Sequence, residues 1–186
     1  MVVVVKMLHL SMLLIVFVML SCVSEKGVVE MSEKSLVVKT AFENGSRIPE
    51  KYTCDGIDVS PPLRLGEVDE NAKSLVVIVD DPDAPMGVFT HWIAWNIAPV
   101  KEIPEGMPKE KIVSSPVKMI QGVNDFGRIG YNGPCPPRGK PHRYYFKVYA
   151  LDTVLSLEPG AGKKELEKAM EGHVIQFGEV MGMYWR

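Results

Sequence analysis

The sequence has few of the residues that build metal centres and hydrolytic active sites. Its 186 residues include three cysteines and four histidines, with no Gly-x-Ser-x-Gly and no His-Glu-x-x-His segment. Internal repeats and low-complexity tracts are absent, and a formal net charge of -2 gives no reason to expect non-specific nucleic-acid binding. The whole chain is 46% hydrophobic and 24% charged, a composition that suits one domain with a sizeable core.

The N-terminus differs in composition from the rest of the chain. Lys6 precedes a mostly apolar run, Met7–Leu20, and a small residue follows before Cys22. This order predicts an export signal, and the four residues ending at Cys22 also resemble a bacterial lipobox, in which Cys22 would be lipidated and tether the protein to a membrane. An uncleaved anchor or a misassigned start codon, which would leave the protein cytoplasmic, are the alternatives. We expect a leader and polar tether in residues 1–35 and one domain in 36–186.

Beyond the leader the pattern is rich in β structure. A single helix is predicted at Gly162–His173, where Leu166 and Met170 share one face and charges cover the other. Mostly β structure with one late helix predicts an antiparallel sandwich with the helix packed at its edge. The predicted strands are Leu36–Phe42, Leu75–Val79, His91–Ile97, Ile112–Val117, Tyr144–Leu151 and Val174–Met183.

Acidic and histidine residues cluster at the ends of predicted strands. Asp81 and Asp83 follow a buried strand in an Asp-Pro-Asp-Ala-Pro stretch, whereas His91 and His142 each begin a strand. If these strands are neighbours, the four residues converge at one end of a sheet. Carboxylates would then raise the pKa of the histidines, whose charged rings would bind a phosphate or carboxylate. The plainer alternatives are a simple turn and structural histidines, and Asp80 has no assigned role.

A long connection, Gly122–Pro141, is rich in glycine and proline and precedes the strand that starts at His142. Its length marks it either as functional or as held in place by another part of the protein, and its stiffness suits the rim of a preformed pocket. Cys54 and Cys135 form an even pair in what would be an oxidising compartment, so a disulfide is plausible, with two free thiols as the alternative. The cysteines have no nearby histidine pair at zinc-like spacing, so we expect no metal.

Together, four segments resemble the phosphatidylethanolamine-binding protein family, which includes Raf kinase inhibitor protein. They are Asp81–Pro85, His91 on a strand ending at Asn96, Gly133–Pro137 and His142–Tyr144. The resemblance covers Leu36 to Tyr184, and Lys51–Gly56 with the cysteine in the proline loop is similar to the bacterial and archaeal branch. It implies a sandwich of two antiparallel sheets with Greek-key topology, and a C-terminal helix near an anion pocket. The ligand-binding residues that it implies are Asp81, Asp83, His91, Pro134, Pro136, His142 and Tyr144.

The function expected from this resemblance is binding without catalysis or a cofactor. The ligand would be a small anion, such as phosphate, a carboxylate or a phospholipid headgroup. Phe89 stands where animal members have Trp, and Cys135 is inserted in the rim, so the pocket wall differs from theirs. A protease or kinase inhibitor acting by protein contact is the alternative, and a metal-dependent hydrolase using the two acids and two histidines ranks third. The oligomeric state stays open, a homodimer included.

Overall fold

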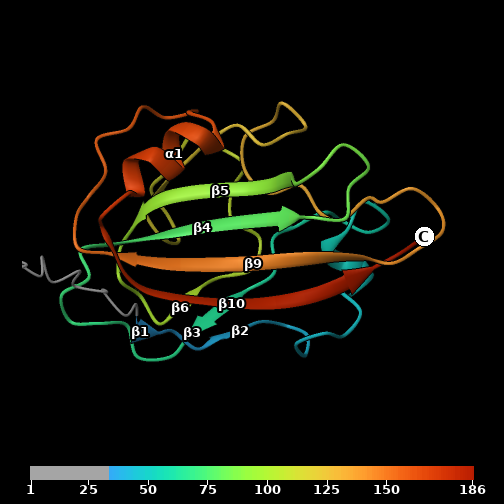
Figure 1. Ribbon diagram of the computed structural model, residues 1–186, viewed down its shortest axis with the longest axis horizontal. Helices are drawn as coiled ribbons and strands as arrows, with labels where there is room; N and C mark the ends of the chain where they lie inside the picture. The colour runs from blue at the N-terminus through green and yellow to red at the C-terminus, as the bar shows by residue number, and fades with distance from the viewer. Residues whose placement is uncertain (1–33) are drawn as a thin grey trace, which may run out of the picture. The chain divides into compact units, whose positions relative to one another are not determined.

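The computed structural model describes residues 34–186 (Figure 1). The predicted export signal and the lipidation site at Cys22 lie outside these residues. Lys34 and Ser35, predicted to end the tether, form the first strand of a sheet. Within the described range, no helix is both long enough and apolar enough to span a membrane.

Strands dominate the described chain, as predicted. The long central strands extend beyond the predicted ranges by one to three residues, whereas the predicted first and fourth strands are each reduced to two residues. The helix begins directly after Gly162 and is shorter than predicted at its C-terminal end. In chain order the elements are β1 (Lys34–Ser35), β2 (Val38–Lys39), the 3-10 helix η1 (Glu50–Tyr52), β3 (Leu63–Leu65), β4 (Ser74–Asp81), β5 (Phe89–Ile97), β6 (Glu102–Ile103), β7 (Ile112–Val113), β8 (Met119–Gln121), β9 (His142–Leu151), α1 (Lys163–Met170) and β10 (Val174–Tyr184).

Two sheets form the sandwich. The larger has the strand order β1-β10-β9-β4-β5-β8-β7, and the smaller has the order β2-β3-β6. Within the larger sheet, β9 returns beside β4 after β5 and β8, which gives the Greek-key order β9-β4-β5-β8. The prediction of two purely antiparallel sheets is wrong for the larger one, because β1 pairs with β10 in parallel. These two strands are far apart in the sequence and no hairpin joins them, so their connection does not require them to run antiparallel.

The central strand β4 is buried on both faces, which explains its unbroken apolar sequence. Val77 and Val79 belong to the core between the sheets, together with Leu63 of the smaller sheet. Val76 and Ile78 face the other way and pack in a second cluster with Leu166 and Met170 of α1. The helix therefore covers the outer face of the larger sheet (Figure 1).

Candidate functional site

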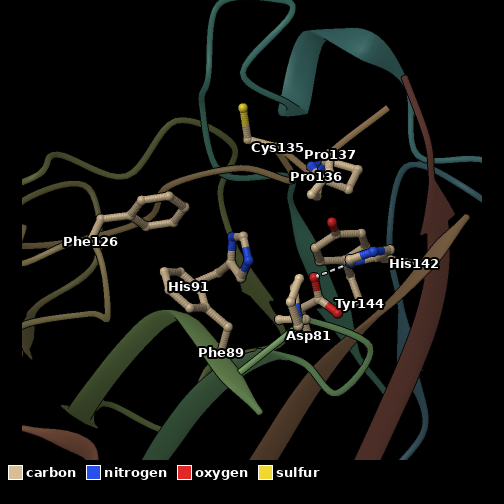
Figure 2. Close-up of a pocket in the computed structure, with 11 residues that line it drawn as sticks. Asp81, Phe89, His91, Phe126, Cys135, Pro136, Pro137, His142 and Tyr144 are labelled. Carbon is tan, nitrogen blue, oxygen red and sulfur yellow. Dashed lines mark hydrogen bonds and ion pairs between the residues drawn. The ribbon is translucent and has the colours of Figure 1, made fainter. Parts of the chain in front are cut away.

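A pocket of about 150 Å³ lies where β4 ends and where β5 and β9 begin (Figure 2). Both neighbours of β4 run antiparallel to it, so the end of one strand meets the beginnings of the other two. This topology brings the predicted acid and histidines together, as the sequence led us to expect. The pocket is lined by Asp81, Ala84, Pro85, Phe89, His91, Phe126, Cys135, Pro136, Pro137, His142 and Tyr144.

A β-bulge at His91 directs the start of β5 into the pocket. The ladder with β4 steps from Trp92, opposite Val79, directly to Thr90, opposite Asp80, and leaves His91 as an extra residue. Such a bulge shifts the alternation of side chains by one position. Phe89, which regular alternation would turn away from the face of Trp92, lines the pocket instead.

Asp81 and His142 form the polar floor of the pocket (Figure 2). The Asp81 Oδ2 atom lies 2.8 Å from Nδ1 of His142, and the two side chains are only 5% and 12% exposed. The other carboxylate oxygen accepts a hydrogen bond from the backbone N–H of Asp83 at 2.8 Å. Both oxygens of Asp81 are therefore engaged, and one of them fixes the orientation of the His142 ring.

Asp83 points away from the pocket lining. Its carboxylate accepts hydrogen bonds from Nε and Nη2 of Arg143 at 2.8 and 2.6 Å, and from the Arg143 backbone N–H at 2.9 Å. The hydrogen bond to the Arg143 side chain is the largest reason that the pKa of Asp83 falls to about 2. Asp83, which the sequence placed beside the histidines, lies near His142, where it ties the loop after β4 to the start of β9 and does not line the pocket.

Asp80, which received no role from the sequence, is an anchor for the helix on the opposite face. Its side chain is 2% exposed and accepts hydrogen bonds from Lys163 at 2.8 Å, from Lys147 at 3.1 Å and from the Thr90 hydroxyl at 3.1 Å. Since Lys163 begins α1, this cluster fixes the start of the helix to the sheet. No residue of α1 lines the pocket, and the helix approaches the site through Lys163 at Asp80, next to Asp81.

The His91 ring is buried and held by the loop that follows β8. Its Nδ1–H donates to the backbone carbonyl of Asn132 at 2.7 Å, which leaves Nε2 as the unprotonated nitrogen of a neutral ring. Burial lowers the pKa of His91, and this effect exceeds the opposing one of the Asp81 charge. The expectation that neighbouring carboxylates raise the pKa is therefore wrong for this histidine, because loss of hydration outweighs the charge.

The hydroxyl of Tyr144 is buried and has no hydrogen-bond partner among residues 34–186. Burial, followed by the charge of Asp81, raises the pKa of this hydroxyl above its usual range. Asp81 lies close enough to contribute to this shift through its charge and through a poorly aligned hydrogen-bond interaction, but the contact does not have the geometry of a hydrogen bond. A buried donor without an acceptor is rare in folded proteins, and an atom bound in the pocket would supply one.

Aromatic rings form the apolar wall of the pocket. Phe89, His91 and Phe126 make mutual edge-to-face contacts, with ring centroids 4.8–5.4 Å apart. Tyr144 contacts His91 in the same manner at 5.2 Å. The sequence did not single out Phe126, because nothing distinguishes it locally from other residues of the predicted long loop.

The rim of the pocket is joined to the segment around η1. The Sγ atoms of Cys54 and Cys135 lie at bonding distance, 2.10 Å apart, and the Cys54 N–H donates to the Pro134 carbonyl at 3.1 Å. Pro136 lines the pocket as predicted, whereas Pro134 lies behind the rim. In the described part of the chain, no three His, Cys, Asp or Glu side chains are grouped as metal ligands would be.

Comparisons with known proteins agree with this architecture. The phosphatidylethanolamine-binding protein family model matches residues 38–185. A UPF0098 protein of Pyrococcus abyssi is 68% identical over 155 residues, which cover 83% of this chain and 87% of the relative.

Two crystal structures share the fold. One, from Chlamydia trachomatis, is described as a phosphatidylethanolamine-binding protein homologue; it is 43% identical, with a TM-score of 0.74 over 83% of this chain and 99% of the other. The second, from Escherichia coli, is described as a new member of the mammalian family; it is 31% identical, with a TM-score of 0.75 over 81% and 98%. The chain therefore belongs to the phosphatidylethanolamine-binding protein family.

Proposed function

We propose that this protein is a non-catalytic binding protein whose pocket takes a single phosphoryl or carboxylate group. The observation that carries the proposal is the buried Tyr144 hydroxyl, which has no acceptor among the described residues. An anionic oxygen in the pocket would supply that acceptor. The hydrogen bond would be charge-assisted and therefore stronger than one between neutral groups.

His142 adds a second donor that would face such a ligand. Because Nδ1 of His142 is held by Asp81, a ligand would meet the other ring nitrogen, Nε2. An imidazolium at this position carries a proton on each nitrogen, one for Asp81 and one for the ligand.

The size of the pocket limits the ligand. A volume of about 150 Å³ holds roughly five water molecules at about 30 Å³ each, which is enough for one phosphoryl or carboxylate group. The acyl chains of a phospholipid would remain outside, so free phosphate and a lipid headgroup present the same chemistry to this pocket. The aromatic and proline walls would contact the apolar part next to the anionic group.

The arrangement of Asp81 supports binding rather than hydrolysis. A carboxylate that acts as nucleophile or general base needs an oxygen directed at the substrate. Both oxygens of Asp81 already accept hydrogen bonds, one from Asp83 and one from His142. In this arrangement Asp81 orients His142 and fixes the loop after β4, a role that suits binding and leaves both bonds intact.

Isothermal titration calorimetry with inorganic phosphate and with O-phosphoethanolamine tests the proposal. We expect saturable binding of at least one of them, weakened roughly tenfold to a hundredfold by Tyr144→Phe through loss of a hydrogen bond to a charged group. Tyr52→Phe is the matched control, because its hydroxyl bonds Glu105 and does not line the pocket. Absence of binding by the unmodified protein, or equal affinity of both variants, would refute the proposal.

A further inference from the structure

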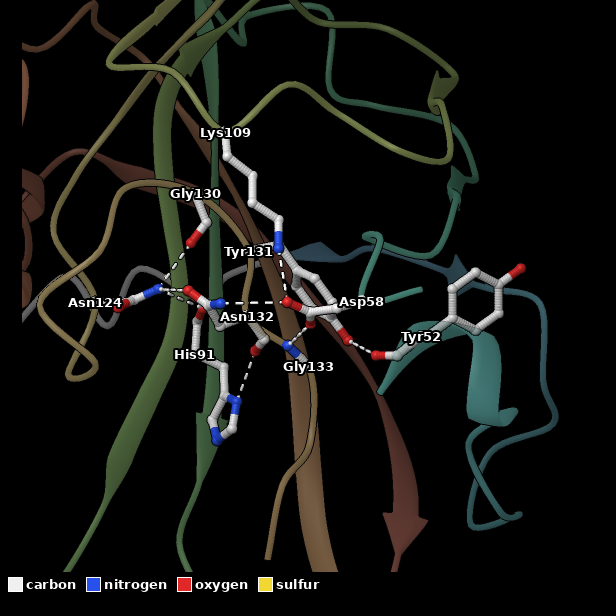
Figure 3. A network of polar contacts seen from close by, with 9 residues as sticks. All are labelled: Tyr52, Asp58, His91, Lys109, Asn124, Gly130, Tyr131, Asn132 and Gly133. Carbon is white, nitrogen blue, oxygen red and sulfur yellow. Dashed lines mark hydrogen bonds and ion pairs between the residues drawn. The ribbon is translucent and has the colours of Figure 1, made fainter. Parts of the chain in front are cut away.

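A single peptide unit connects the pocket to a carboxylate outside it (Figure 3). The Asn132 carbonyl accepts the Nδ1–H of His91 at 2.7 Å, and the N–H of the same peptide, which belongs to Gly133, donates to Oδ1 of Asp58 at 2.6 Å. In a trans peptide these two groups point in opposite directions. The imidazole, the peptide and the carboxylate therefore form one continuous chain of hydrogen bonds.

Asp58 is held firmly at the end of this chain. Its Oδ2 atom accepts hydrogen bonds from Lys109 at 2.7 Å and from the side chain of Asn132 at 3.3 Å. Its backbone has a positive φ of 56°, a conformation that Asp and Asn tolerate better than other non-glycine residues. The side chain is 28% exposed, so its charge is only partly screened by solvent.

The peptide itself has little freedom to rotate. The N–H of Asn132 donates to the His91 carbonyl at 3.0 Å, so His91 and Asn132 are joined through both backbone and side chain. Asn124 donates to the side-chain oxygen of Asn132 at 2.8 Å. Gly133 packs so closely against Tyr52 that an added Cβ would overlap the Tyr52 carbonyl oxygen.

We infer that Asp58 is a positioning residue for the ligand site: through the Asn132–Gly133 peptide it holds His91 in the Nδ1–H tautomer. A carboxylate that accepts from one end of a peptide polarises it and makes the carbonyl at the other end a stronger acceptor. The Nδ1 proton is thereby kept on the loop side of the ring. Nε2 is then the nitrogen that a ligand in the pocket can use.

This inference rests on the proposed function only for its consequence. An unprotonated Nε2 accepts a hydrogen bond from a protonated ligand oxygen, or takes up a proton when an anion arrives. The tautomer itself is a property of the ligand-free protein. Measuring it first keeps a failure of this inference separate from a failure of ligand binding.

Nitrogen-15 NMR of the His91 ring in the ligand-free protein, before and after Asp58→Asn, tests the inference. The unmodified protein should show a protonated Nδ1 and a bare Nε2. Asn suits the positive φ and keeps the size of the side chain while removing its charge. We expect the variant to populate the Nε2–H tautomer, to shift the Gly133 amide proton upfield, and to exchange that amide roughly five- to tenfold faster.

Two controls separate positioning from general loosening. Lys109→Met removes an ion pair of Asp58 but keeps its bond to Gly133, so the His91 tautomer should not change. Asp55→Asn makes the same charge change in the same segment, where the carboxylate bonds Tyr184 and Arg186, and should also have no effect.

The inference is overturned if Asp58→Asn leaves both the tautomer and the Gly133 amide unchanged, or if Lys109→Met shifts the tautomer equally. Should Asp58→Asn fail to fold, Asp58→Gly replaces it, because glycine also suits the positive φ and removes the carboxylate. An unchanged His91 tautomer in that variant contradicts the inference. Phosphate titration of the folded variants afterwards reports on the ligand site alone.

Discussion

Replacing Tyr144 with Phe should weaken anion binding and yet leave the folded protein at least as stable as before. The substitution removes one buried hydroxyl that has no partner among the described residues. Leaving a polar group buried and unsatisfied costs about 1–3 kcal/mol, so its removal returns up to that amount. A water molecule bonded to the hydroxyl in the pocket would bring the gain toward zero, but it would not turn the gain into a loss.

Tyr131→Phe is the matched control for stability. Its ring is also fully buried, at 1% exposure against 0% for Tyr144, but its hydroxyl donates to the Tyr52 carbonyl at 2.7 Å. Removing that donor leaves a carbonyl without its partner and should cost about 1–3 kcal/mol. The two substitutions are chemically identical, and only the presence of an acceptor separates their expected effects.

Urea denaturation monitored by tryptophan fluorescence measures both variants against the parent protein. For a domain of this size, each kcal/mol corresponds to about 2–4 °C in Tm, so thermal scans give an independent check. The reasoning would be refuted if Tyr144→Phe lost as much stability as Tyr131→Phe. That result would show that the Tyr144 hydroxyl has an acceptor within the protein and does not need a ligand atom to supply one.

Two further predictions concern buried charge. Because burial lowers the pKa of His91 below the unfolded value of about 6.5, the unfolded chain binds a proton that the folded chain does not. The free energy of unfolding should therefore fall as the pH drops below about 6.5, by up to about 1.4 kcal/mol per pH unit. His91→Asn should remove this contribution to the slope. Denaturation curves with the same slope for the variant and the parent protein would contradict a lowered pKa of His91. Asp80→Asn should cost about 3 kcal/mol in urea denaturation, because Lys147 and Lys163 lose a buried partner, whereas Asp152→Asn at an exposed pair should cost less than about 1 kcal/mol. Equal losses for the two would show that the Asp80 cluster does not anchor α1.

The sequence predicts the long strands well because their signals are local. The apolar run of β4 and the aromatic-rich segment of β9 have strong β propensity, and both form long central strands. Two-residue strands such as β1 and β6 carry no such signal, since their pairing depends on neighbours that are distant in the chain. The parallel pairing of β1 could not be predicted for the same reason.

The site was predicted as far as residue types at strand ends allow. Asp81, His91, His142 and Tyr144 were found because motif residues fall where β4, β5 and β9 meet. The partners of each side chain depend on rotamers and on the bulge in β5, which the sequence does not show. For this reason the sequence assigned both Asp81 and Asp83 to the histidines, whereas the contact with His142 is made by Asp81. The burial of His91 was not predicted for the same reason.

The contacts around the pocket rim were harder still to predict. Asp58 and Asn132 are 74 residues apart and meet through one side-chain bond. No periodicity or spacing relates them, and Asp and Asn in loops most often serve local turns. Only the folded chain shows that hydrogen bonds join them to a histidine in a third segment.

The bulge at His91 separates the first two residues of β5 from the rest of the strand, whose ladder with β4 has a second register shift between Leu75 and Val77. In an unbroken ladder, a one-residue slip would exchange the buried and exposed faces along the whole strand. The extra residue at His91 sets the register of Phe89 and Thr90 apart from that of the part from Trp92 onward. The pocket wall at Phe89 can therefore be altered, in a natural relative or by design, without disturbing the packing that stabilises the fold.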